Sequence, residues 1–373
     1  DSASRMERWK AVKVLITGGA GFLGYHLAHH FAARGWSVGL LDVAPFNPPE
    51  YPSGAQFYMC DVRDKSTLDT VVRSFHPDAI IHAAAALPLS SRTGIFTTNV
   101  DGTRNVIEAG RRYGVGRVVY VSSTAVYGIP RKHPIEETDR LQGVGPYGES
   151  KILAERACEE FRKLGYTVPV IRPKTFIGPA RLGVFAILYD WVYSGARIPI
   201  LGRGTNRYQL LDVRDLCQAV ELLTVWDATA VNNTFNVGAE RFSTVREDLG
   251  GLCEAARTGA RPLPIPALPA QMTLALLEKM LLSPLYKWVY LTADKDSFVS
   301  VVRLKEATGW SAQFSNQDAL IDSYRWYVAH QDECAEAGMG VTHRVAWDQK
   351  VLGALKAVLS LGTRADAHKG SAS

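Results

Sequence analysis

The segment VLITGGAGFLGYHL, close to the N-terminus, limits the possible folds of this chain more than any other feature of its sequence. A short apolar run leads into Gly18, Gly21 and Gly24, and a helical apolar pattern follows them. Glycines at this spacing allow a tight turn that brings backbone N–H groups and a helix N-terminus against a pyrophosphate. The segment therefore predicts a strand, a phosphate-binding turn and a helix.

Asp42 adds a second element to this pattern. It ends the next apolar run, SVGLLD, where an acidic side chain can accept hydrogen bonds from the hydroxyls of an adenosine ribose. Its carboxylate would repel a 2′-phosphate, and the following VAPF contains no arginine to receive one. We therefore expect NAD as the cofactor rather than NADP, with Phe22 and Leu23 at the start of the helix among its contacts. The alternative is that the glycines only turn a strand into a helix and that Asp42 is solvated.

Short β-branched runs alternate with helical patterns as far as residue 180, which is typical of an α/β fold with a doubly wound parallel sheet. RYQLLDV and NTFNVGA, farther along the chain, are expected to be strands that return to this sheet. The predicted domains are an NAD-binding domain of residues 11–180 and 207–240, a smaller substrate domain of 181–206 and 241–330, a helical extension of 331–362 and a disordered tail of 363–373.

Composition narrows the class of protein. Of the 373 residues 47% are hydrophobic and 21% charged, which is enough apolar material for a large core. The net charge is +5, but the basic residues are dispersed, so we expect no nucleic-acid partner. The five cysteines lack a paired spacing, which favours the cytoplasm, and the histidines lack metal-ligand spacing, so no metal is predicted. The apolar stretch at 272–291 contains charged residues and a proline, so no transmembrane segment is expected.

Tyr147 and Lys151 lie four residues apart in GPYGESKILAE, at the expected start of a helix. Pro146 suits the first turn of a helix, and residues four apart share one helix face. The ammonium would favour the phenolate form of the tyrosine, so the pair predicts a proton-transfer group. Lowering the pKa of a phenol from about 10 to about 7 takes roughly 4 kcal/mol, more than an exposed pair supplies, so further positive charge is expected. An ordinary amphipathic helix is the alternative.

Other motifs accompany these, namely CDVRD at 60–64, HAAA at 82–85, NVDGT at 99–103, VSSTAVYG at 121–128 and LLDVRDL at 210–216. Together they make residues 12–328 resemble the extended short-chain dehydrogenase/reductases of the NAD-dependent epimerase/dehydratase group, which have a Rossmann fold. The resemblance implies that Lys151 also contacts the nicotinamide ribose and that the oxidised nicotinamide is the further positive charge. It implies that the adenine and the middle of the cofactor are lined by Asp61, Val62, Ala83, Ala84 and Ala85.

The same resemblance assigns a proton relay to three residues. Ser123 would orient the substrate alcohol, Tyr147 as phenolate would remove its proton, and the hydride would leave to the nicotinamide. Lys151 would keep the phenolate available. Ser122 is the alternative hydroxyl, and Asn99 either supports the relay or the cofactor or serves as a cap or core residue.

The substrate region departs from the nucleotide-sugar enzymes of the family. Those enzymes typically have R-x-F-N-x-Y-G-P where this chain has RPKTFIGP, so Thr175 replaces an asparagine that contacts the substrate diphosphate. Tyr208 stands where they have a diphosphate-pairing arginine, although Arg207 and Arg203 lie close by. Thr124 and Ala125 replace the Asp-Glu pair that dehydratases carry after the catalytic threonine.

The leading interpretation is an enzyme that oxidises a secondary alcohol with tightly held NAD and epimerises a nucleotide sugar through a transient keto intermediate, as a homodimer. An oxidoreductase of a lipid or sterol alcohol, similar to 3β-hydroxysteroid dehydrogenases, is the first alternative, and a non-catalytic NAD-binding sensor is the second. The apolar stripe of residues 345–361 predicts a helix that packs against its own chain or a second subunit, with contact to a membrane surface as the alternative. The candidate substrate residues are Thr124, Thr175, Arg207 and Tyr208.

Overall fold

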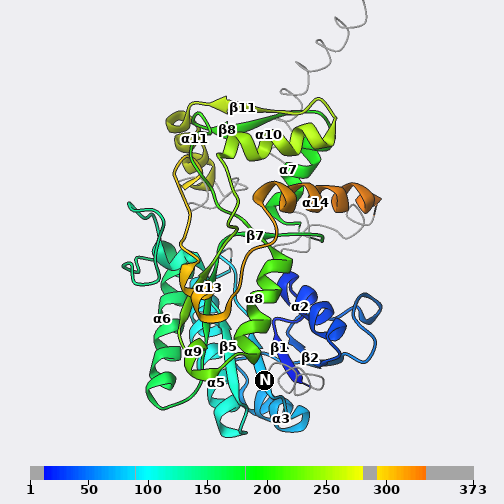
Figure 1. Cartoon of the computed structure of the whole chain (residues 1–373), viewed down its shortest axis with the longest axis vertical. Coiled ribbons are helices and arrows are strands. Elements are labelled where there is room, and N and C mark those ends of the chain that lie inside the picture. The colour runs from blue at the N-terminus through cyan, green and yellow to red at the C-terminus, as the bar shows by residue number, and fades with distance from the viewer. Residues whose placement is uncertain (1–11, 89, 181, 280–291, 333–373) are drawn as a thin grey trace, which may run out of the picture. The chain divides into compact units, whose positions relative to one another are not determined.

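Seven short segments pair into one parallel β-sheet (Figure 1). The residues of the central strands are almost all buried, as expected where helices cover both faces of a sheet. In order across the sheet the strands are β10 (Thr234–Val237), β6 (Val170–Pro173), β5 (Arg117–Val121), β4 (Ala79–His82), β1 (Lys13–Thr17), β2 (Ser37–Asp42) and β3 (Gln56–Met59). The doubly wound fold predicted from the sequence is confirmed.

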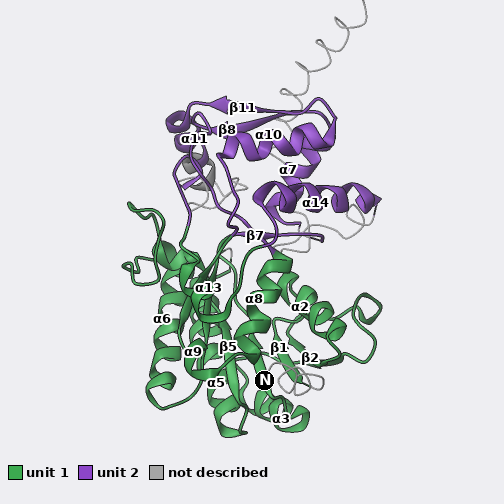
Figure 2. Ribbon diagram, in the orientation of Figure 1, with its two compact units in different colours: residues 1–174, 213–238, 299–312 green, residues 175–212, 239–298, 313–373 purple. Residues whose placement is uncertain are grey.

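This computed structural model describes residues 12–88, 90–180, 182–279 and 292–332. The chain divides into two compact units, shown in different colours in Figure 2. Unit 1 consists of residues 1–174, 213–238 and 299–312, and unit 2 of residues 175–212, 239–298 and 313–373. The helix predicted at 345–361, most of the extension predicted at 331–362 and the tail of 363–373 lie outside the described residues.

Helices cover the sheet of unit 1 in two layers. On one face α2 (Phe22–Ala33) packs against α8 (Val213–Val225). On the other face α5 (Gly102–Arg112) packs between α3 (Lys65–Phe75) and α6 (Gly145–Lys163), over a core of buried side chains that includes Leu15, Leu68, Ile107, Val118 and Phe161. The shorter helical segments are η1 (Pro48–Glu50), α4 (Arg92–Phe96), the π-helical turn η2 (Thr97–Asp101), η3 (Thr124–Tyr127), α9 (Ala228–Val231) and α13 (Val302–Thr308).

The order of the strands reverses between β1 and β4. From β1 the chain proceeds through β2 and β3 to one edge of the sheet, and from β4 through β5 and β6 to the other. In open α/β sheets, ligands bind at the carboxyl ends of the strands on either side of such a reversal. The glycines after β1, the alanines after β4 and the serines after β5 all lie at the carboxyl ends of these strands, where the sequence predicts the cofactor.

Unit 2 has a core of its own, formed mainly by aromatic and aliphatic side chains of α7, α10 and α14. It contains two parallel strand pairs, β8 with β11 and β7 with β9. None of the described helices of the chain is long and apolar enough to cross a membrane. The elements of unit 2 are β7 (Phe176–Ile177), α7 (Val184–Tyr193), β8 (Arg197–Leu201), β9 (Leu211–Asp212), α10 (Val245–Ala256), β11 (Arg261–Ile265), α11 (Ala267–Lys279) and α14 (Asn316–Ala329).

The two segments expected to return to the main sheet behave differently. NTFNVGA does so, as β10 beside β6. The prediction for RYQLLDV was wrong, because its only strand, β9, pairs with β7 in a separate sheet. This pairing explains why residues 175–180 and 207–212 belong to unit 2 rather than to the predicted NAD-binding domain. Residues 299–312 instead join unit 1, where α13 packs against α9 and β10.

Candidate active site

The glycine turn after β1 is packed so closely that side chains are excluded from it. Gly18 has a φ of +75°, and a Cβ there would lie 2.8 Å from the backbone nitrogen of Ala84. A Cβ on Gly24 would overlap the Gly18 carbonyl oxygen and lie 2.6 Å from Gly19 Cα. Helix α2 begins at Phe22 without a side-chain cap and without an acidic residue in its first turn. A helix N-terminus without a side-chain cap or an acidic first turn suits an anion such as a dinucleotide pyrophosphate.

The carboxylate of Asp42 lies at the end of β2, next to this turn. Its two oxygens accept backbone hydrogen bonds from Ala20 and Ala44, each at 2.9 Å. A carboxylate oxygen can accept more than one hydrogen bond, so both remain able to receive ribose hydroxyls. Asp42 therefore lies against the glycine turn and offers hydrogen-bond acceptors where the sequence predicts the adenosine ribose.

Asp61 and Val62 follow β3, as the expected adenine contacts. Val62 is buried, while the Asp61 carboxylate pairs with Arg63 through both of its oxygens, at 2.9 and 3.0 Å from Nε. These hydrogen bonds lower the pKa of Asp61. Asp61 and Arg63 line an open cavity of about 750 Å³ together with Thr97 and Asn105.

The alanine segment after β4 is held by polar groups that the sequence analysis did not single out. The backbone nitrogen of Ala83 donates to the carbonyl of Thr17, and that of Ala84 to the Thr17 hydroxyl, both at 3.2 Å. Thr17 in turn contacts Nδ1 of His82 at 2.7 Å. Burial lowers the pKa of His82 to about 3, so the imidazole is neutral and acts as a hydrogen-bonding link inside the sheet. Ala85 continues the segment, half-buried.

Asn99 connects this segment to α6. Its Oδ1 accepts from the backbone nitrogen of Ala86 at 2.8 Å, and its Nδ2 donates to the hydroxyl of Ser150 at 3.0 Å. Asn99 lies in the π-helical turn η2, a distortion that is frequent at functional sites. Of the roles considered for Asn99, these contacts favour support of the cofactor segment and of the helix that carries Tyr147.

Ser123, Tyr147 and Lys151 come together at the carboxyl end of β5. Ser123 caps η3, with its hydroxyl accepting from the Ala125 nitrogen at 3.1 Å, and this hydroxyl lies close enough to Tyr147 to lower the pKa of the phenol. The Lys151 ammonium donates to the carbonyl of Val121 at 2.9 Å and lies 5.9 Å from the centre of the Tyr147 ring. A substrate hydroxyl bonded to Ser123 would therefore lie beside the phenol.

Within the chain alone, burial governs the pKa values of both Tyr147 and Lys151. Burial raises the pKa of Tyr147 to about 12, and the nearby Ser123 hydroxyl opposes this rise only in part. Burial also lowers the pKa of Lys151 to about 8. The ammonium is directed at a backbone carbonyl rather than at the phenol, so within the chain alone desolvation dominates and Tyr147 is protonated.

Ser122, the alternative hydroxyl, is occupied elsewhere. It is buried and donates to Oε1 of Glu155 at 2.5 Å, which favours Ser123 as the hydroxyl that meets the substrate. Glu155 is also bound by Arg172 on β6. Sequence reasoning missed both residues, although Glu155 lies one helical turn after Lys151.

The candidate substrate residues divide between the two units. In unit 1, Thr124 is buried and its hydroxyl donates to the carbonyl of Pro173 at 3.3 Å. In unit 2, the hydroxyls of Thr175 and Tyr208 lie 3.4 Å apart, so the two residues that depart from the nucleotide-sugar pattern contact each other. Arg207 is exposed, and its guanidinium lies over the rings of Phe242 and Phe298, at 4.6 and 4.9 Å from their centres.

Comparison with known proteins agrees with this geometry. The sequence profile of the NAD dependent epimerase/dehydratase family matches residues 14–238. The uncharacterized protein y4nG of Sinorhizobium fredii is 30% identical over 350 residues, which cover 93% of this chain and 86% of that protein. A UDP-glucose 4-epimerase of Rhizobium leguminosarum bv. trifolii is 28% identical over 282 residues, covering 68% of this chain and 84% of the relative.

A solved structure gives the same result for the fold. The UDP-glucose 4-epimerase of Thermus thermophilus, in complex with NAD, has a TM-score of 0.69 at 26% identity, covering 85% of this chain and 99% of that one. The residues of unit 1 fit this cofactor, since the glycine turn leaves room only for backbone and Asp42 offers acceptors for ribose hydroxyls. The chain therefore belongs to the NAD-dependent epimerase/dehydratase family and is an NAD-dependent enzyme.

Proposed function

We propose that this enzyme epimerises a nucleotide sugar by oxidising one secondary hydroxyl to a transient ketone and reducing that ketone from the opposite face. The observation that carries the proposal is that Tyr147 lies beside Ser123 at the carboxyl end of β5, with the Lys151 ammonium 5.9 Å from the centre of the Tyr147 ring. The relatedness to UDP-glucose 4-epimerases supports the choice of substrate class.

Each side chain has a defined task in this reaction. Ser123 holds the substrate hydroxyl, and Tyr147 takes its proton in the oxidation and returns it in the reduction. When bound, NAD supplies the hydride acceptor, the source of the returning hydride and a positive charge that favours the Tyr147 phenolate. Lys151 supports that phenolate from the same helix, one turn away.

The raised pKa of Tyr147 suits the second half of the reaction. A phenol with a pKa of about 12 holds its proton firmly unless positive charge is added, so it is a proton donor to a developing alkoxide rather than a permanent base. An epimerase needs both directions in one cycle, because the proton removed in the oxidation must return to the same oxygen.

Arg207 is the residue of unit 2 that we propose for the substrate diphosphate. Its guanidinium plane is held by two aromatic faces, and its N–H groups make no side-chain hydrogen bond to any other described residue. Such a stacked, planar fork suits two phosphate oxygens. Arg203, the other candidate, is exposed and no described aromatic side chain orients it, so Arg207 is the better candidate.

The test of the activity is incubation of the purified enzyme with UDP-glucose and, separately, UDP-galactose, UDP-uronic acids and hydroxysteroids. We expect a change of configuration in a sugar nucleotide and no accumulation of NADH, since the returning hydride regenerates NAD in every cycle. Stoichiometric NADH release with a steroid and no change in any sugar nucleotide would instead establish the dehydrogenase alternative. Absence of turnover with all of them would favour the sensor.

The role of Arg207 is tested separately. Arg207→Lys keeps the charge but loses the planar fork, and we expect KM for the sugar nucleotide to rise by about 10-fold with kcat nearly unchanged. Arg203→Lys is the matched control and should leave KM as it is. Equal effects of the two substitutions would contradict the proposed diphosphate contact. The homodimer and the cytoplasmic location expected from the sequence stay predictions.

A further inference from the structure

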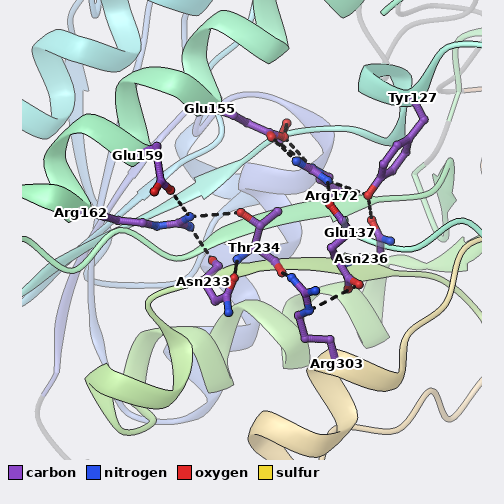
Figure 3. Close-up of polar contacts among 11 residues, drawn as sticks. Tyr127, Glu137, Glu155, Glu159, Arg162, Arg172, Asn233, Thr234, Asn236 and Arg303 are labelled. Atoms are coloured by element: carbon purple, nitrogen blue, oxygen red, sulfur yellow. Dashed lines mark hydrogen bonds and ion pairs between the residues drawn. The ribbon is translucent and has the colours of Figure 1, made fainter. Parts of the chain in front are cut away.

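A buried ion pair contacts Ser122, the residue that precedes the serine of the relay. Glu155 on α6 and Arg172 on β6 are joined by three hydrogen bonds, at 2.9, 3.1 and 2.5 Å (Figure 3). Their side chains are only 8% and 5% exposed. Taking two charges out of water is costly, so a pair this deeply buried calls for an account of what else it holds in place.

The Glu155–Arg172 pair contacts both ends of the segment formed by residues 122–127. The segment of residues 122–127 contains Ser123, and its first residue, Ser122, donates to Glu155 at 2.5 Å. Its last residue, Tyr127, receives a hydrogen bond from Arg172 at 2.7 Å. One ion pair thus sets both ends of a six-residue segment whose second residue is the proposed substrate contact.

The same pair is joined to the helix of the relay. Tyr147, Lys151 and Glu155 follow one another at intervals of four residues on α6, so they form one stripe along the helix. From Tyr127 the hydrogen bonds continue to residues outside α6. The Tyr127 hydroxyl donates to Oδ1 of Asn236 in β10 at 2.7 Å, and the backbone nitrogen of Asn236 donates to the Glu137 carboxylate at 2.8 Å (Figure 3). The segment is therefore held between helix and sheet and does not rest on the helix alone.

We infer that Glu155 and Arg172 are a positioning pair, which holds residues 122–127 against α6 so that the Ser123 hydroxyl meets the Tyr147 phenol. Neither residue touches the substrate. The inference rests on the proposed roles of Ser123 and Tyr147, and it adds the reason why these two residues, 24 positions apart in the sequence, remain in register. Small misplacements of reacting groups reduce rates steeply, which is how such a pair would act on turnover.

The cleanest perturbations leave no unpaired buried charge. Tyr127→Phe removes one attachment and keeps the ion pair. Arg172→Lys keeps the charge but cannot bond Glu155 and Tyr127 with one planar fork. We expect kcat with the sugar nucleotide to fall about 10-fold for Tyr127→Phe and about 100-fold for Arg172→Lys, with KM and the NAD content of the purified protein unchanged.

Glu155→Gln adds a readout that loss of stability alone would not change. Lys151 is faced by Glu155 and Cys158 on its own helix, by Tyr120 of β5 and Tyr147, and by His82 of β4. Among these, the Glu155 carboxylate raises the pKa of Lys151. Its removal should move the alkaline limb of the pH–rate profile to lower pH. Glu159→Gln is the control, because it makes the same change one turn farther along α6 at an exposed carboxylate that pairs with Arg162, and it should leave kcat and the pH profile unchanged.

Hydrogen exchange of the holoenzyme separates this inference from the proposed function. We expect the amides of residues 122–127 to exchange about 10-fold faster in Tyr127→Phe and Arg172→Lys, while those of β1 and β4 exchange as in the wild type. If the wild type converts no sugar nucleotide but this pattern appears, the proposed function fails and the positioning pair stands. Wild-type kcat and exchange in both variants, or faster exchange in all strands alike, would overturn the positioning role.

Discussion

Gly24→Ala tests whether the turn after β1 binds NAD by close approach of backbone groups. The added methyl would lie 2.6 Å from Gly19 Cα, whereas ordinary contacts lie at 3.4–4 Å. The clashing atoms belong to the backbone and cannot rotate away as a side chain could. The glycine segment after β1 and the start of α2 must therefore separate by about 1 Å, which lowers the free energy of unfolding by about 1–3 kcal/mol. A pyrophosphate bound there should lose the equivalent of one charge-assisted hydrogen bond, about 1.5–3 kcal/mol. We therefore expect NAD affinity to fall by about 10- to 100-fold.

The assay is the NAD content of the purified protein together with calorimetric titration of NAD into stripped protein. Gly250→Ala is the matched control, since Gly250 lies inside α10 with no heavy atom within 4 Å of the added Cβ. That change should leave NAD binding intact and raise the free energy of unfolding by up to about 1 kcal/mol, because alanine is the better helix former. Gly24→Ala protein that binds NAD as tightly as the control would refute the close-approach reasoning.

Three further predictions concern single side chains. Tyr147→Phe should leave folding and NAD binding intact while lowering turnover by about 100-fold, measured with the sugar nucleotide that the wild type converts. Asp42→Asn should narrow the preference for NAD over NADP by about 10-fold or more, measured by titration of both, because the amide no longer repels a 2′-phosphate. Burial lowers the pKa of Lys151 from 10.5 to about 8, so the folded chain binds fewer protons than the unfolded chain between these values and its stability should rise as pH increases through that window. Lys151→Met should remove this rise and increase the free energy of unfolding at neutral pH by about 2–3 kcal/mol, measured by urea denaturation. An unchanged dependence of stability on pH would contradict this prediction.

Local spacing in the sequence was sufficient to predict the cofactor-binding turn and the parallel strands that position it. Gly18 and Gly24 mark a turn that only backbone can occupy, and the apolar runs of β1, β4 and β5 predict buried parallel strands. Both signals depend on residues within a few positions of each other, so they survive without knowledge of distant contacts. The four-residue interval between Tyr147 and Lys151 belongs to the same class, because a helix places them on one stripe wherever it packs.

Only the tertiary structure decided how those residues behave and what holds them. The spacing of Tyr147 and Lys151 predicts that the ammonium favours the phenolate together with further positive charge. Within the chain alone, burial raises the pKa of Tyr147 and lowers that of Lys151, and burial is the sum of packing by many distant segments. No local spacing in the sequence links Glu155 to Arg172, and only the fold brings them together beside Ser122. The two-residue strand β9 is too short for any periodic signal, so its pairing with β7 rather than with the main sheet depends on long-range contacts alone. Spacing along the chain encodes which groups can share a local element, whereas solvation and partners across the chain depend on the whole packed core.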